Sequence, residues 1–584
     1  MKKSLSIAIL VIQLFGCVLT CRSQGFIKAE GTKLVDGSGK PILLRGMGLG
    51  GWMLQEGYML KINDQGQQHK IKERIADVIG AEKTKEFYKA WLYNHTQKID
   101  IDSMHSWGFN SVRLPMHYNL YTLPIEEEPV AGQQTWLQQG FDITDSLLAW
   151  CKANNMYLIL DLHAAPGGQG NDLNISDRDP SKPSLWESEA NQEKTIALWK
   201  ELATRYANQP WIGGYDILNE PNIGFTDPVK DRNGINEEKN IPLKNLYTRI
   251  THAIRQVDTN HTIIIEGNGW GNNYNGLMPL WDKNMVLSFH KYWSFNDQES
   301  ISKALAFRKI FNVPIWYGET GENSNVWFTQ AIQMFETNDI GWCWWPLKKI
   351  GFNNPLEIKK PAGYDKLLSY WKDKKGKPAN AEAYSILMQL AANAGLANTI
   401  YHKDVVDAMF RQPFSDETLP FTNSVVKNGT VINAVDYDLG KNGFAYYDTD
   451  TADYWVSGKP GKGNNGNVYR NDGVDIFADS SLAEQYYVGD MAAGEWLQYL
   501  LHIAESGTYN IEVLFKVKSG KKSLTIGVDQ KTLQTIILPV AASTGKWQKA
   551  LFKNLVLPGG EVKLRIGTPT GGMQIQSLKF VKIK

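Results

Sequence analysis

Asp216–Asn222 reads DILNEPN, and the interpretation of the whole chain starts from this stretch. A short apolar run stops abruptly at Asn219-Glu220-Pro221, because proline has no N–H and restricts the residue before it. Glu220 is therefore expected at the rim of a buried strand. Val313–Thr320, VPIWYGET, is a second apolar run that ends in a carboxylate, Glu319. One such glutamate is often an ordinary turn residue, but two at the same ends of two barrel strands face each other across the barrel mouth.

Strand-like and helix-like segments alternate before residue 350. This alternation predicts a parallel sheet, and eight repeats in roughly 350 residues predict an α/β fold of the (β/α)8 type. The turn residues Asp36-Gly37-Ser38-Gly39 suit a hairpin that closes the barrel floor. The expected strands are Ile42–Met47, Ser111–Leu114, Tyr157–Leu162, Gly214–Leu218, Thr262–Glu266, Val286–Phe289, Val313–Gly318 and Gly341–Trp345. The helices expected between them include Asp142–Ala153, Ala190–Tyr206, Pro242–Val257, Glu299–Phe311 and Val326–Thr337, and long inserted loops are expected at Pro166–Leu185, Asn222–Asn240 and Leu347–Pro378.

The chain has 584 residues, which is too long for a single core, so we expect more than one domain. Residues 26–395 are assigned to the barrel, and residues 396–429 to a helical extension and linker. From Val431 onward, short alternating strands and Gly/Asn/Asp turns replace the helical periodicity. This pattern predicts an all-β sandwich, similar to a jelly roll, over residues 430–584.

The first residues have the form of an export signal. Lys2-Lys3 precedes the apolar run Leu5–Leu19, which is too short to span a membrane as a helix. Cleavage near Ser23-Gln24 makes residues 1–23 a signal peptide, with lipidation at Cys17 or Cys21 as the alternative. The prediction is an exported protein that is periplasmic, extracellular or a cell-surface lipoprotein, and no later stretch qualifies as a transmembrane segment.

Composition narrows the range of partners. The net charge is +1 and there is no basic run, so nucleic acid and anionic membranes are not expected as partners. The chain has 20 Trp and 25 Tyr, more than a core requires. Flat aromatic faces pack against the C–H faces of sugar rings, so this surplus favours a carbohydrate ligand.

Two carboxylates at strand ends suit the cleavage of a glycosidic bond. Retaining hydrolysis needs an acid that protonates the leaving oxygen and a carboxylate about 5–5.5 Å away that attacks the anomeric carbon. Glu220 is the expected acid/base and Glu319 the expected nucleophile. Other strand ends carry polar or aromatic residues, each of which alone is more often structural. Together they predict a binding site made of Arg113, His163, His290, Tyr292 and Trp345.

These residues carry a resemblance to a known family. Residues 26 to about 395 resemble glycoside hydrolase family 5, whose members are retaining (β/α)8 enzymes acting on β-linked glucans, mannans and related glycosides. The resemblance implies that Asn219 contacts the 2-hydroxyl of the sugar and that Tyr292 hydrogen-bonds the nucleophile. The segment Asp161–Gln169, DLHAAPGGQ, is most similar to the exo-β-1,3-glucanase branch.

The last part of the chain carries a second resemblance. Residues from about 430 to 584 resemble carbohydrate-binding module family 6, in the runs AYYDTD (445–450), YRNDGVDI (469–476) and AGEW (493–496). The resemblance implies that Tyr469 and Trp547 clamp a sugar ring beside Gln574. Asn433 and Val435 stand where that family has two calcium-binding Glu residues, so a structural calcium is not the expectation.

The sequence therefore predicts an exported retaining β-glycoside hydrolase that acts on a β-glucan in the manner of an exo-β-1,3-glucanase and carries a glycan-binding module. An endo-β-1,4-glucanase or mannanase on the same scaffold is the alternative. A glycan-binding protein with an inactive barrel is the alternative of another class. No cofactor and no catalytic metal are expected, and the oligomeric state is left open.

Overall fold

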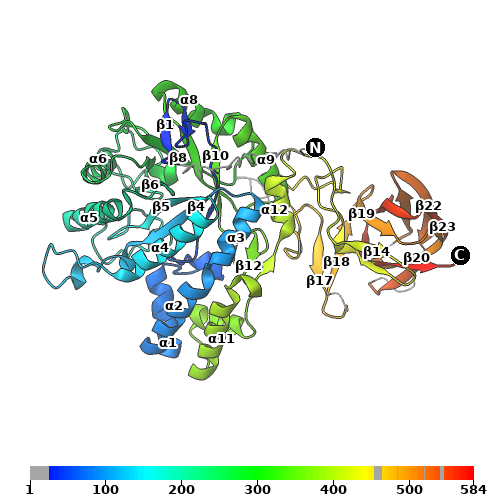
Figure 1. Cartoon of the computed structure of the whole chain (residues 1–584). Helices are drawn as coiled ribbons and strands as arrows, with labels where there is room; N and C mark the ends of the chain where they lie inside the picture. Colours follow the sequence, from blue (N-terminus) through cyan, green and yellow to red (C-terminus); the bar gives the residue numbers. More distant parts are fainter. Residues whose placement is uncertain (1–24, 453–462, 483–484, 518–519, 539–544) are drawn as a thin grey trace, which may run out of the picture.

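The structure is a computed structural model that describes residues 25–452, 463–482, 485–517, 520–538 and 545–584. The predicted signal peptide, with Cys17 and Cys21, lies outside these residues. Parallel strands close into a barrel in the order β10-β3-β4-β5-β6-β7-β8-β9, with helices around it (Figure 1). The predicted (β/α)8 fold is confirmed, and each expected strand overlaps one barrel strand. These are β3 (Arg45–Gly48), β4 (Ser111–His117), β5 (Tyr157–Ala164), β6 (Ile212–Asp216), β7 (Ile263–Glu266), β8 (Met285–Lys291), β9 (Ile315–Gly321) and β10 (Gly341–Trp345).

Apart from the half-buried Arg45 at the start of β3, the barrel strands are buried along their whole length, because helices cover the outer face and side chains fill the interior. At the amino-terminal end of the strands, Ile27, Tyr157 and Trp316 belong to a separate apolar cluster. Strands β1 (Lys28–Glu30) and β2 (Lys33–Val35) form an antiparallel hairpin at this end. The hairpin predicted at Asp36–Gly39 is present, since Val35 pairs antiparallel with Pro41 and the Ile42 N–H donates to the Leu34 carbonyl at 2.9 Å. A second chain reversal lies between β1 and β2.

The helices expected from their periodicity are present, and several others were not predicted. Helices α1, α2, α10 and α11 share an apolar cluster beside the barrel, and α10 lies within the stretch predicted as a long loop, Leu347–Pro378. The helices are α1 (Gln68–Ile79), α2 (Ala81–His95), α3 (Lys98–Trp107), α4 (Gln138–Ala153), α5 (Glu189–Tyr206), α6 (Ile241–Arg255), α7 (Asn268–Gly271), α8 (Ser302–Phe311), α9 (Asn325–Thr337), α10 (Tyr364–Asp373), α11 (Asn380–Asn393) and α12 (Lys403–Phe410). A small sheet beside them contains β11 (Lys348–Lys349), β12 (Leu356–Glu357) and β13 (Ile400–Tyr401).

The carboxyl-terminal part is a β-rich domain with two main sheets packed around its own apolar core, coloured yellow to red in Figure 1. One sheet has the order β14-β19-β24-β21-β22 and the other β17-β18-β25-β20-β23. Ser424–Val426, part of the predicted linker, is a strand of the first sheet because it pairs with β19. The strands are β14 (Ser424–Val426), β15 (Val431–Asn433), β16 (Tyr446–Tyr447), β17 (Ile476–Ala478), β18 (Tyr486–Met491), β19 (Trp496–Ile503), β20 (Gly507–Val517), β21 (Lys522–Val528), β22 (Lys531–Leu538), β23 (Gln548–Leu557), β24 (Gly560–Gly567) and β25 (Met573–Lys582).

Within the described residues, no helix combines the length and the apolar character that crossing a membrane requires.

Candidate functional site

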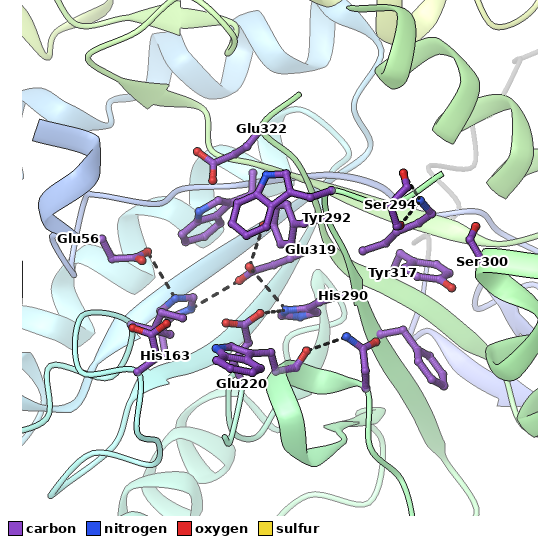
Figure 2. Close-up of a pocket in the computed structure, with 18 of the residues that line it drawn as sticks. Glu56, His163, Glu220, His290, Tyr292, Ser294, Ser300, Tyr317, Glu319 and Glu322 are labelled. Carbon is purple, nitrogen blue, oxygen red and sulfur yellow. Dashed lines mark hydrogen bonds and ion pairs between the residues drawn. The ribbon is translucent and has the colours of Figure 1, made fainter. Parts of the chain in front are cut away.

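The barrel strands bring the residues predicted for the site together at their carboxyl ends. Glu220 follows β6, His290 lies near the end of β8, and Glu319 lies in the last part of β9. One carboxylate oxygen of Glu220, one of Glu319 and one ring nitrogen of His290 lie within 4.8 Å of one another. Figure 2 shows the carboxylates of Glu319 and Glu220 facing each other in one pocket, with His290 beside both. The opposition of the two carboxylates, inferred from strand ends, is therefore present in the structure.

Arg113 in β4 is fully buried beneath these groups. Its guanidinium donates to Glu319 Oε1 at 2.5 Å and to Asn219 Oδ1 at 2.8 Å. It also donates to Asp216 and Glu266, both at 2.9 Å, and lies 3.1 Å from Asp161. A buried cation among several carboxylates is stable because each opposite charge offsets part of the desolvation cost.

The three additional acids, Asp161, Asp216 and Glu266, were not predicted as site residues. Each is an acidic residue inside or at the end of an apolar strand, which is a signal that could have been read from the sequence. A charged residue at a buried strand position requires a buried partner. Arg113 is that partner for all three.

Glu319 is held from two sides. Arg113 donates to Oε1, and the Tyr292 hydroxyl donates to Oε2 at 3.0 Å. Two charge-assisted or hydroxyl hydrogen bonds, one to each oxygen, restrict the orientation of the carboxylate. The carboxylate is therefore fixed in position and suited to act as a nucleophile toward a carbon placed above it.

Glu220 lies in a different environment. Its backbone has φ 41°, in the left-handed region, and its N–H donates to Glu266 Oε2 at 2.7 Å. His290 Nδ1 lies 2.7 Å from Glu220 Oε1. Burial raises the pKa of Glu220 to about 7, against the opposing effect of His290 and with a contribution from Glu319. A carboxyl with this pKa is protonated in part near neutral pH and can donate a proton.

His163 and Asn219 orient each other beside the pair. His163 Nδ1 lies 2.7 Å from Asp161, and its Nε2 lies 3.3 Å from Asn219 Nδ2. Burial lowers the pKa of His163 to about 3, so the imidazole is neutral and accepts through Nε2. The amide of Asn219 thus has its oxygen on Arg113 and its nitrogen toward His163 and the pocket.

One side of the pocket is closed by aromatic and charged side chains. Trp345 stacks on His163 at 5.1 Å between ring centroids, and its indole N–H donates to the Tyr58 hydroxyl at 3.0 Å. Glu322 also lines this side and forms an ion pair with Lys349 at 2.5 Å. Buried Glu56 lies 3.9 Å from His163 Nε2, and burial, followed by Glu319 and Glu322, raises its pKa well above the usual range. Glu56, Tyr58 and Glu322 were not predicted as site residues. Glu56 and Tyr58 do not follow directly on a predicted strand, whereas Glu322 follows the end of β9.

The pocket has a volume of about 900 Å³ and is open on its other side. Trp270 lines this side, and its backbone N–H donates to the carbonyl of Pro221, next to Glu220. A more polar hollow continues beyond it and shares Asp172, Asn174 and Trp270 with the pocket. The pocket therefore has Tyr58, Trp345 and Glu322 in its wall and adjoins this second hollow at Asp172, Asn174 and Trp270.

Glu220, His290 and Glu319 also satisfy the distances of a three-ligand metal site. Burial opposes the charged form of His290, but Glu266 and Glu319 outweigh it and raise the pKa of His290 well above its ordinary value. A protonated imidazole is not a metal ligand. The three residues therefore fit proton transfer better than metal binding.

The structure separates the residues predicted to bind glycan in the carboxyl-terminal domain. Tyr469 packs on Tyr486 toward the core, and its hydroxyl donates to Asp436 at 2.5 Å. Trp547 instead packs on Tyr487, with Lys516 Nζ 4.5 Å from its ring. Successive residues of a strand point to opposite faces, so Tyr469 and Trp547 lie on opposite faces of β18. The predicted clamp of these two rings is not formed.

Gln574, the third residue of the predicted clamp, lies on the side of the domain where Trp547 is found. It pairs with Lys516 between β25 and β20, on the face where Lys516 approaches Trp547. Its Oε1 has no hydrogen-bond partner among the described residues. Asn433, at the predicted position of a calcium ligand, donates instead to Asp436 at 3.2 Å.

Comparison with protein families gives two matches. Residues 69–350 match the family described as Cellulase (glycosyl hydrolase family 5). Residues 470–579 match the family described as Carbohydrate binding module (family 35). The predicted type of each domain is thereby supported, but the assignment of the second domain to family 6 was wrong.

Curated relatives are similar at low identity. A "Beta-xylosidase" of Phanerodontia chrysosporium is 28% identical over 378 residues, covering 58% of this chain and 74% of its own length. A "Probable glucan 1,3-beta-glucosidase A" of Aspergillus niger is 27% identical, over 44% of this chain and 57% of its own length. An "Endoglucanase C" of Acetivibrio thermocellus is 24% identical, over 46% of this chain and 88% of its own length.

Proposed function

We propose that the chain is a β-glycoside hydrolase with a glycosyl hydrolase family 5 barrel and a carbohydrate-binding module, and that it cleaves β-glucosidic bonds with retention of configuration. The family matches of residues 69–350 and 470–579 support this proposal. The observation that carries the proposal is the pair Glu220 and Glu319, whose nearest oxygens lie within 4.8 Å. That separation suits direct attack by one carboxylate and leaves too little room for a water molecule between substrate and base. Their different surroundings suit different roles.

In the first step, Glu319 attacks the anomeric carbon while Glu220 protonates the departing glycosidic oxygen. The bond from the anomeric carbon to that oxygen breaks, and an ester bond to Glu319 forms. In the second step, ionised Glu220 removes a proton from water, whose oxygen displaces Glu319. Arg113 and Tyr292 hold Glu319 in place during both steps, and Asn219 is positioned to contact the neighbouring 2-hydroxyl.

We propose that cleavage proceeds from a chain end. Tyr58, Trp345 and Glu322 line the pocket and are fixed by the Trp345–Tyr58 hydrogen bond and the Glu322–Lys349 ion pair, and we take them as the wall behind the terminal sugar. This arrangement leaves room for one terminal sugar on that side, so the rest of the substrate extends past Trp270 as the leaving group. An endo-acting enzyme needs space for several sugars on both sides of the scissile bond.

The proposed substrate is a β-glucan of the 1,3-linked type. Support comes from the segment 161–169 and from the similarity to a protein named a probable glucan 1,3-beta-glucosidase. The relative named Beta-xylosidase makes a terminal xylose the competing choice for the same closed pocket. Both sugars fit the proposed mechanism, since they differ only in the hydroxymethyl group at carbon 5.

Product analysis tests the proposal. The purified chain is incubated with laminarin, a soluble cellulose derivative, glucomannan and the 4-nitrophenyl β-D-glucoside and β-D-xyloside, and products are followed from the first minutes. Glucose alone from laminarin, with β configuration in early NMR spectra, is the expected result. A ladder of oligosaccharides would indicate endo action, and early α-glucose would exclude retention. No turnover, with Glu220 and Glu319 in place, would favour a binding protein.

A further inference from the structure

The short segment between β9 and α9 links the pocket to the carboxyl-terminal domain. β9 ends at Gly321, two residues after Glu319, and α9 begins at Asn325. Glu322 points into the pocket and pairs with Lys349 (Figure 2 labels Glu322). The next three residues, Asn323, Ser324 and Asn325, are buried.

These three residues are held by the carboxyl-terminal domain. Asn471 Nδ2 donates to the Asn323 carbonyl at 2.8 Å and lies 3.1 Å from Asn325 Oδ1. The Asn325 N–H donates to the Asn471 carbonyl at 2.8 Å. Ser324 Oγ donates to the Ala452 carbonyl at 2.8 Å. Each residue of the segment therefore has at least one hydrogen bond that crosses the domain boundary.

Asn471 is itself firmly placed. It is 2% exposed, and its N–H donates to Asp404 Oδ2, which also accepts from Asn325 Nδ2. The preceding residue, Arg470, is buried over the Tyr437 ring and forms an ion pair with Asp472 at 2.8 Å. Buried polar groups satisfied from several sides fix one geometry, because any displacement leaves them unpaired.

The pocket side of the segment is under backbone constraint. Gly321 has φ 130°, and a Cβ there would lie 2.8 Å from the Trp345 carbonyl. Glu322 has φ 52°, in the left-handed region, where a residue with a side chain is disfavoured by about 1–2 kcal/mol per residue. Such conformations persist where the surroundings hold them. The hydrogen bonds to Asn471 and Ala452 begin at the very next residue.

We propose that the carboxyl-terminal domain is part of the catalytic unit and that Asn471 is a positioning residue, which holds Glu322 against the sugar at the closed end of the pocket. The inference rests on the proposed function for its substrate. It departs from the usual view of a binding module as a tether, because here the module restrains the wall of the catalytic pocket directly. Loss of Asn471 is therefore expected to change recognition of a small soluble substrate in the barrel pocket.

The test is a double-variant cycle on the full chain with 4-nitrophenyl β-D-glucoside. Asn471→Ala, Glu322→Ala and the double variant are compared well below their Tm values. Each single variant is expected to raise KM about fivefold or more. The double variant is expected to have the KM of the single variant with the larger effect, because both substitutions remove the contact between Glu322 and the sugar. Asn510→Ala is the matched control, since Asn510 Oδ1 accepts from the Asn554 N–H within the module. An unchanged KM for Asn471→Ala, or effects that multiply in the double variant, would overturn the inference.

A second measurement keeps the two proposals separate. If the wild-type chain hydrolyses none of the glycosides, the proposed function fails and the positioning role is judged by hydrogen exchange. Peptides covering residues 319–327 are expected to exchange faster in Asn471→Ala than in the wild type or Asn510→Ala. Equal exchange in all three proteins would overturn the positioning role.

Discussion

His290 Nδ1 lies 2.7 Å from Glu220 Oε1, while His290 Nε2 lies 3.2 Å from Glu266. The imidazole therefore links the proposed acid to a buried carboxylate that also binds Arg113. Burial raises the pKa of Glu220 to about 7 in spite of this contact. Because the general acid has to be protonated, kcat/KM for an unactivated glucoside is expected to fall above about pH 7, and by about tenfold per unit at higher pH. Initial rates across pH 4–9 check this.

The variant Glu220→Gln serves as the control for this assignment. It cannot donate the proton, so the decline above pH 7 should vanish and the remaining activity should be low. A 2,4-dinitrophenyl glucoside needs little protonation of its leaving group and should lose far less activity in this variant. Equal losses on both substrates would mean that Glu220 is not the acid.

Glu319→Ala is expected to remove the nucleophile while the fold survives. Turnover should fall by at least about 1,000-fold, as for the loss of other residues that act directly at the reacting atoms. Added azide can enter the vacated space and attack the anomeric carbon, which should yield an α-glycosyl azide with an activated β-glucoside. Glu220→Ala with azide should give the β-product instead. The reverse pattern would exchange the two roles, and unchanged turnover in Glu319→Ala would reject the assignment.

Trp547 and Tyr469 provide a matched pair of aromatic variants in the carboxyl-terminal domain. Trp547→Ala is expected to weaken retention of the chain on insoluble β-glucan with little change in Tm, because the ring lies on the outer face of its sheet. Tyr469→Ala is expected to lower Tm, because it removes a ring packed on Tyr486 and the hydrogen bond to Asp436. Sedimentation with insoluble glucan and thermal scans separate the two effects. Reduced glucan binding by folded Tyr469→Ala alone would reverse this assignment.

The barrel could be predicted from the sequence because its signals are local. Each strand is a short apolar run with a polar residue at its carboxyl end, and the fold itself brings those ends together. That rule accounts for His163, Glu220, His290, Tyr292, Glu319 and Trp345 lining one pocket, with Arg113 and Asn219 buried in contact with them.

Contacts between distant segments could not be predicted in the same way. Glu56 and Tyr58 reach the pocket from the start of a one-turn 3-10 helix, Gly57–Leu60, which is too short to show periodicity in the sequence. Tyr469 and Trp547 were paired by resemblance, but strand alternation at Tyr486 and Tyr487 places them on opposite faces. Asn471 contacts barrel residues that are 146 and 148 positions away in the sequence. No local sequence pattern predicts a buried polar junction of this kind.

Asp177 connects a loop that lines the pocket to the rest of the barrel. Replacing Asp177 is expected to change how the stability of the protein depends on pH. Its carboxylate contacts His69 Nδ1 at 2.7 Å and His117 Nε2 at 2.9 Å, and the loop that contains it also carries Asp172 and Asn174 into the pocket. Burial opposes ionisation, but the two histidines lower the pKa of Asp177 to about 2. Asp177 has φ 50°, which asparagine tolerates well, so Asp177→Asn is a conservative test.

The folded pKa of Asp177 is below the unfolded value of 3.8, so the stabilisation is present above that value and is lost as the pH falls toward 2. The hydrogen bond that His69 donates to the Asp177 carboxylate raises the pKa of His69, so that contribution is complete below pH 6.5 and is lost as the pH rises further. The difference in Tm between wild type and Asp177→Asn should therefore be largest between about pH 4 and 6.5. There the lowered pKa of Asp177 corresponds to about 2 kcal/mol in the free energy of unfolding. Asp179→Asn, whose carboxylate accepts from Ser181 in the same loop, is the control and should show a smaller difference. A Tm difference for Asp177→Asn that is constant from pH 2 to 8 would show that the ion pair with the histidines is not what holds the loop.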